Sequence, residues 1–236
     1  MTHAARPIRA AVITGEHTFD VPAFHALWRG LPAIDCYVQD LDNFVRADGE
    51  TRARYDVLIF YHYHLDTPPG NERGWWQGGT KETLEALGET AQGLFVLHHA
   101  LGAFPQWPFW SDVVGIPHQE RDSPLEDIRR SASVQPLHIE IADAAHPITR
   151  GLTAWDLRGE VWGDTLGDPG ADSQVLLRTR HPRSKLTAMA WTRRYKRAPV
   201  FCLQPGHDDA TWADPHYRTV VARAITWLAQ PPASAP

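Results

Sequence analysis

An apolar segment that runs directly into two histidines constrains the fold of this chain most strongly. Residues 93–97 read Gly-Leu-Phe-Val-Leu, and His98 and His99 follow at once. Consecutive apolar residues predict a strand that is buried on both faces, as in a sheet covered by helices. Polar side chains at the carboxyl end of such a strand lie where open α/β sheets bind their ligands. The segment therefore predicts an α/β fold with a site at this strand end.

Three further apolar segments end in polar residues in the same way. Residues 8–15, 55–61 and 198–205 lead into His17, His62 and His207, respectively. Parallel strands have their carboxyl ends at one edge of a sheet, so these histidines are expected to converge there. We found no internal repeat and no linker. The prediction is a single α/β domain over residues 1–236, with a mostly parallel central sheet.

Composition limits which binding partners and which cellular compartment are expected. The formal net charge of −5 gives no basic stripe, so a nucleic-acid partner is not expected. No apolar run approaches the roughly 20 residues that cross a bilayer, and no signal-peptide pattern opens the chain. Membrane association is therefore not expected. Cys36 and Cys202 both lie inside apolar segments and give no disulfide framework. These features favour a cytoplasmic protein.

Histidines at several strand ends indicate either a metal site or acid–base chemistry. Neutral imidazoles and carboxylates are the usual ligands of zinc and similar ions. We expect His17, His98 and His207 to bind a divalent metal. The catalytic residues that we expect are His98, His207 and Glu160. Histidine titrates near neutrality, so the same groups could transfer protons without a metal, and the sequence leaves both mechanisms open.

A serine or cysteine nucleophile is not expected. A strand, a sharp turn and a helix are typical of a nucleophile elbow, but His98 and His99 stand where a Ser or Cys would be required. Neither cysteine lies at a strand end beside a histidine. The sequence therefore argues against a cysteine-dependent amidotransferase.

The 10 tryptophans suggest the class of ligand. Several lie in predicted loops or at strand ends, where an aromatic face suits a sugar ring, although packing alone would explain them equally well. The substrate-binding residues that we expect are His17, His62, Trp107, His118 and Asp208. Tryptophan-rich loops also suit a subunit interface, so a homodimer is an alternative use of these residues.

Several motifs in a fixed order resemble the ThuA-like (trehalose utilisation) family. Between about residues 8 and 229 these are Gly15-Glu16-His17-Thr18-Phe19, Gly93-Leu94-Phe95-Val96-Leu97-His98, Gly115-Ile116-Pro117-His118, His146-Pro147-Ile148-Thr149-Arg150-Gly151-Leu152 and Gly206-His207-Asp208. The resemblance implies a flavodoxin-like, class I glutamine amidotransferase-like three-layer sandwich that lacks the amidotransferase cysteine. It also implies a core over about residues 8–229.

The resemblance further implies a role in the metabolism of trehalose and related disaccharides or keto-sugars. The residues that match the polar motif positions of the family are His17, His98, His118, Glu160 and His207. We expect a metal-assisted or His/Glu acid–base hydrolase or isomerase with a small sugar as partner and no nucleotide cofactor. The alternative is a non-catalytic sugar-binding or regulatory module, because a fold does not fix a function.

Overall fold

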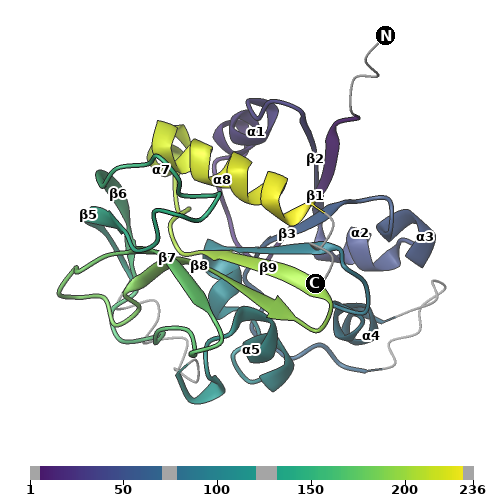
Figure 1. Ribbon diagram of the computed structural model, residues 1–236. Helices are drawn as coiled ribbons and strands as arrows, with labels where there is room; N and C mark the ends of the chain where they lie inside the picture. The colour runs from purple at the N-terminus through teal and green to yellow at the C-terminus, as the bar shows by residue number, and fades with distance from the viewer. Residues whose placement is uncertain (1–5, 71–78, 121–131, 231–236) are drawn as a thin grey trace, which may run out of the picture.

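A single nine-stranded sheet runs through the molecule (Figure 1). The computed structural model describes residues 6–70, 79–120 and 132–230, so Trp75 and Trp76 lie outside the described residues. In order across the sheet, the strands are β2 (Ile34–Asp40), β1 (Ile8–Gly15), β3 (Val57–His62), β4 (Gly93–Leu97), β9 (Ala198–Leu203), β8 (Ala188–Tyr195), β7 (Gln174–Arg178), β5 (Ser133–Ile141) and β6 (Trp155–Val161).

The sheet consists of a parallel half and an antiparallel half. Strands β2, β1, β3, β4 and β9 pair in parallel, whereas β9, β8, β7, β5 and β6 pair antiparallel. The prediction of a mostly parallel sheet is therefore wrong, because four of the eight pairings are antiparallel. The connection between β8 and β9 explains part of the difference. Lys196, with φ 49°, and Arg197 alone join these strands, and so short a loop can only form an antiparallel hairpin.

Helices lie on both faces of the sheet (Figure 1). One face carries α1 (Val21–Arg29), α7 (Asp209–Ala213) and α8 (Pro215–Leu228), which contact one another in that order. The other face carries α2 (Leu41–Arg46), α4 (Thr80–Glu85) and α5 (Pro108–Val114), with α3 (Gly49–Arg52) beside α2. Two short 3-10 helices are η1 (His98–Gly102) and η2 (His118–Glu120). In the described part of the chain, every helix is too short or too polar to span a membrane.

The core follows the apolar segments of the sequence. Every residue of β3, β4 and β9 is buried, as expected for strands covered by helices on both sides. In β5, Leu137 and Ile139 are buried while His138 between them is exposed, so this strand has one solvated face. Asp214 is the N-cap of α8, since its Oδ1 accepts the backbone N–H of Tyr217 at 2.8 Å.

Candidate functional site

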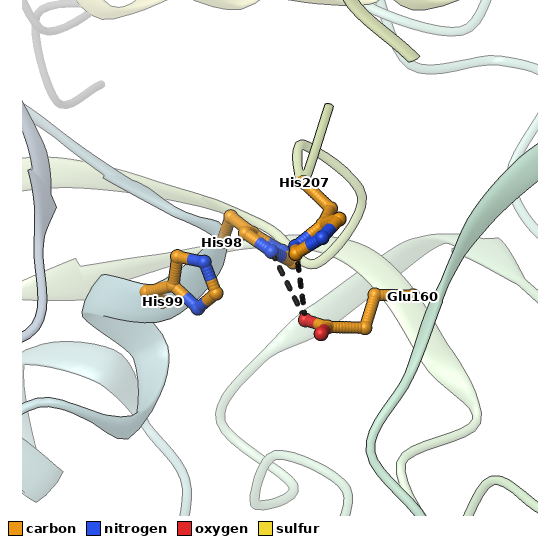
Figure 2. Close-up of side chains that lie close together, drawn as sticks. All are labelled: His98, His99, Glu160 and His207. Carbon is orange, nitrogen blue, oxygen red and sulfur yellow. Dashed lines mark ion pairs between the residues drawn. The ribbon is translucent and has the colours of Figure 1, made fainter. Parts of the chain in front are cut away.

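Three imidazoles and one carboxylate form a compact cluster at the carboxyl ends of strands β4, β6 and β9. His98 and His99 follow β4, His207 follows β9, and Glu160 is the penultimate residue of β6. One ligand-type atom from each residue lies within 4.8 Å of those of the other three. Figure 2 shows the side chains converging from these separate elements. Residues that are more than 100 positions apart in the sequence thus meet at one edge of the sheet.

The turn of its own backbone and a contact with the Gln204 carbonyl hold the ring of His98 in place. Its φ of 51° turns the chain sharply where β4 ends, and its Nδ1 lies 2.6 Å from the carbonyl oxygen of Gln204. Since a carbonyl only accepts, Nδ1 carries a proton, and Nε2 is the ring nitrogen left to face the cluster. Nε2 lies 3.3 Å from Oε2 of Glu160. His98 therefore presents Nε2 to the centre of the cluster.

Glu160 is the anion of the cluster. Its Oε2 accepts a hydrogen bond from Nε1 of Trp162 at 2.7 Å and lies 3.5 Å from Nδ1 of His207. Burial by itself raises the pKa of the Glu160 carboxyl, but the contacts with His98, Trp162 and His207 outweigh burial and lower this pKa to about 2. Glu160 is therefore ionised at neutral pH.

His99 was not among the predicted site residues. It is 8% exposed, and its Nε2 is buried without a hydrogen-bond partner among the described residues. Burial, and after it the neighbouring His98, His17 and His207, lower the pKa of His99 well below its usual value, so the ring is neutral. The signal for His99 was its place beside His98. In an extended strand the two side chains would point to opposite faces, whereas the turn at His98 and η1 direct both rings into the site.

His17 lies against this cluster but is not one of its four members. Its ring packs against that of His99, with centroids 3.7 Å apart and the two planes tilted by 33°. Burial, followed by the charges of His98 and His207, lowers the pKa of His17 to about 4. The structure thus brings the predicted metal ligands His17, His98 and His207 together, but the tightest set of ligand atoms contains His99 and Glu160 instead of His17.

A cavity of about 440 Å³ opens beside the cluster. Its lining combines carboxylate, imidazole, hydroxyl and aromatic groups from Glu16, His17, Thr18, Tyr63, His99, Gly102, Ala132, Glu160, Trp162, Thr165 and Leu166. A more open depression of about 520 Å³ shares His17 and Thr18 with this cavity and is also lined by His207 and Asp208. Asp208 additionally caps α7, since its Oδ1 accepts the backbone N–H of Thr211 at 2.9 Å.

Three predicted substrate-binding residues, His62, Trp107 and His118, are not among the described residues that line the 440 Å³ cavity. His62 is fully buried, with its ring 5.5 Å from that of Trp110 and its Nδ1 3.3 Å from Nδ1 of His64. Trp107 packs in the core, with its ring 4.5 Å from that of Phe109. Nδ1 of His118 lies 3.5 Å from the hydroxyl of Ser111. The sequence predicted that these residues lie in loops, but the side chains of His62 and Trp107 are buried in the core.

Comparison with known proteins assigns the chain to a family. The model of the ThuA family, described as trehalose utilisation, matches residues 16–228. The chain belongs to the ThuA family. The match includes all four residues of the cluster as well as Glu16 and His17 at the cavity wall. No curated protein matches the chain.

Solved structures share the fold of this ThuA-family chain. A ThuA-like protein from Parabacteroides merdae has a TM-score of 0.67 at 17% identity, over 94% of this chain and 90% of that one. A ThuA-like protein from Bacteroides uniformis has a TM-score of 0.65 at 18% identity, over 97% and 94%. A GMP synthase protein from Thermoplasma acidophilum has a TM-score of 0.51 at 10% identity, over 96% of both chains. This chain therefore shares its overall fold with all three of these proteins.

Proposed function

We propose that this ThuA-family chain is a cytoplasmic enzyme that hydrolyses or isomerises a disaccharide or keto-sugar at the cluster of His98, His99, Glu160 and His207. The observation that carries the proposal is the convergence of four ligand atoms within 4.8 Å, next to a cavity large enough for a sugar. The trehalose-utilisation description of the family supports a sugar as the substrate. Cys36 and Cys202 are both free thiols, in keeping with a reducing compartment.

The donor set fits a divalent metal such as zinc. Neutral imidazoles and an ionised carboxylate are the ligands that zinc prefers, and Nε2 of His98 and His99 and Nδ1 of His207 are buried without hydrogen-bond partners among the described residues. We propose that these nitrogens and Glu160 would hold the ion. When bound, such an ion polarises a carbonyl or hydroxyl oxygen or provides hydroxide at neutral pH.

The protein's own groups would orient the reacting atoms. The Gln204 carbonyl holds the His98 ring in one orientation, and Trp162 holds the Glu160 carboxylate through its indole N–H. The His207 side chain is 29% exposed, so it is the member of the cluster most open to water.

Glu160 is better suited to binding an ion than to acting as a general base. A general base works best when its pKa lies near the working pH, and the pKa of Glu160 is held at about 2 by His98, Trp162 and His207 against the effect of burial. A carboxylate with so low a pKa is a weak base but remains available as a ligand. Acid–base catalysis without a metal, with a histidine of the cluster as the base, is the alternative mechanism.

Metal analysis combined with turnover tests the proposal. Protein purified without added metal should contain about one equivalent of a divalent ion and should turn over one member of a panel of disaccharides and 3-keto-sugars. His98→Ala should lose both the ion and the activity. His138→Ala, in which the exposed His138 of β5 is removed, should keep both. Tight sugar binding with neither metal nor turnover would instead support a non-catalytic sugar-binding module.

A further inference from the structure

We infer that the Glu16 carboxylate binds hydroxyl groups of the sugar in the cavity and thereby selects among sugars. This inference rests on the proposed function, because it assigns a role within the same cavity. Glu16 follows β1 directly and is one of the residues that line the cavity, together with His99 and Glu160 of the cluster. It is not one of the four cluster residues, so its role would be recognition and not chemistry.

The backbone of Glu16 is held in an unfavourable conformation. Its φ is 53°, in the left-handed region that residues other than glycine and asparagine rarely adopt. Gly15 before it has a φ of 152°, and a Cβ at that position would lie 2.5 Å from Cε1 of His64. The tight turn carries the chain from β1 to His17, whose ring packs against that of His99. A glycine at position 16 would make this turn with less strain.

No contact within the described residues compensates for this strain. Glu16 is exposed, and no hydrogen bond or ion pair joins its carboxylate to another described residue. Its charge acts on the imidazole of His64, whose pKa it raises against the effect of burial. Strained residues of this kind are concentrated at ligand-binding sites, where the side chain serves an external partner. The partner that the position offers is a molecule in the cavity.

The chemistry of the cavity wall indicates which groups Glu16 would bind. Among the described residues, the lining contains two carboxylates, Glu16 and Glu160, and no lysine or arginine. A carboxylate accepts hydrogen bonds through two oxygens, which suits a pair of neighbouring hydroxyls on a sugar ring. The same charge repels a phosphate or a uronic acid. Glu16 should therefore favour a neutral polyhydroxylated ring over its anionic counterpart.

Titration calorimetry with trehalose and with trehalose 6-phosphate tests this assignment. The wild-type protein should bind trehalose at least about ten times more tightly than its phosphate ester. Glu16→Gln keeps the shape of the side chain but removes the charge. It should therefore weaken trehalose binding by about tenfold and reduce the ratio between the affinities for trehalose and for trehalose 6-phosphate. Zinc binding by this variant should equal that of the wild type, since Glu16 lies outside the cluster.

Ala33 provides a matched control for the backbone strain. Its φ is 58°, it is exposed, and it precedes β2 at the amino ends of the parallel strands, whereas Glu16 lies at their carboxyl ends. Glu16→Gly and Ala33→Gly should each raise the Tm by about 1–3 °C by relieving the left-handed conformation. Only the change at Glu16 should weaken trehalose binding.

The outcomes separate this inference from the proposed function. Unchanged trehalose affinity in Glu16→Gln, with normal turnover of a sugar, would overturn the role of Glu16 and leave the enzyme proposal standing. Equal loss of sugar binding in Glu16→Gly and Ala33→Gly would also overturn it, because the effect would then come from the backbone. A wild-type protein that binds neither trehalose nor maltose and turns over no sugar would overturn both.

Discussion

The chemistry of each histidine in this protein depends on what surrounds its two ring nitrogens. His98 donates from Nδ1 to the Gln204 carbonyl and turns Nε2 toward Glu160 in the cluster. His62 has the same side chain at the end of the neighbouring strand, but its Nδ1 faces another imidazole, His64, and its ring is fully buried between aromatic groups. Identical residues at neighbouring strand ends therefore serve a site in one case and the core in the other.

Burial of His62 should make stability depend on pH. Burial, and then the charge of His64, lower the pKa of His62 well below its usual 6.5. As the pH falls below about 6.5, the unfolded chain takes up this proton and the folded chain does not. The free energy of unfolding should therefore fall with pH, by up to about 1.4 kcal/mol per pH unit from this residue. Urea unfolding between pH 7 and pH 5 measures the slope.

The variant His62→Phe tests whether His62 causes this dependence of stability on pH. His62→Phe places an apolar ring among Phe60, Phe104 and Trp110 and should reduce the dependence of stability on pH. His138→Gln, at an exposed position of β5, should leave the dependence unchanged. Equal slopes in wild type and His62→Phe would contradict the prediction.

At the level of the element, the site depends on sharp turns that directly follow buried strands. Strand β1 ends at Gly15 and is followed by Glu16, β4 is followed by His98, and Gly206 comes three residues after the end of β9; these four residues all have positive φ. A chain that leaves a buried strand must change direction within one or two residues if its next side chain is to face the sheet edge. Positive φ angles provide that change, at a cost in stability when the residue is not glycine.

Gly206 offers a test of this arrangement. Its φ is 151°, and a Cβ there would lie 3.1 Å from both Cβ of His98 and the hydroxyl oxygen of Tyr217. Gly206→Ala should reduce the free energy of unfolding by about 2–3 kcal/mol and weaken zinc binding at least tenfold, because His98 must move. Chemical unfolding and zinc titration measure the two effects.

Gly151 is the control, because a side chain there would strain the backbone without meeting a neighbouring atom. Its φ is 75°, and a Cβ there would meet no atom within 4 Å. Gly151→Ala should reduce stability by only about 1 kcal/mol and leave zinc binding unchanged. The idea that the turn at Gly206 positions His98 fails if Gly206→Ala binds zinc as tightly as the wild type.

At the level of the whole molecule, the cluster joins the two halves of the sheet. The histidines follow β4 and β9 of the parallel half, whereas Glu160 lies on β6 at the far edge of the antiparallel half. Nε2 of Gln204 donates a hydrogen bond of 2.8 Å to the backbone carbonyl of Glu160, and this contact holds β6 next to the end of β9. An ion bound by the cluster would therefore cross-link both halves.

Zinc should stabilise the fold as a consequence. An ion that binds only the folded state adds about 2.7 kcal/mol to the free energy of unfolding at a concentration 100 times its Kd. The Tm of protein stripped of metal with EDTA, measured by calorimetry, should rise with added zinc and fall again when EDTA is added in excess. His98→Ala and Glu160→Gln should abolish the rise, whereas His118→Ala, which alters a residue apart from the cluster, should retain it. The prediction would be contradicted if the Tm of the metal-free wild-type protein did not change on addition of zinc.

Local sequence was sufficient for the parallel half of the fold. Apolar runs predicted the strands β1, β3, β4 and β9 because burial on both faces requires consecutive apolar residues. The N-cap at Asp214 was likewise predictable, since a cap depends on residues within one turn. The predicted meeting of His17, His98 and His207 followed from the geometry of parallel strands.

The antiparallel half and the exact membership of the cluster required the folded structure. Which strands pair, and in which direction, depends on contacts between distant segments, and the amphipathic pattern of β5 does not specify its partners. Whether His62 and Trp107 face a cavity or the core depends on which helix packs over them. The inclusion of His99 depends on the turn at His98.

The sequence by itself determined which strand ends carry imidazoles, because burial periodicity and polar breaks are local properties of the chain. Only the tertiary structure decided that Glu160 reaches the histidines from the other half of the sheet, and that Glu16 lines the cavity beside them. The physical reason is that such distances depend on the packing of segments remote in sequence, which no local pattern encodes.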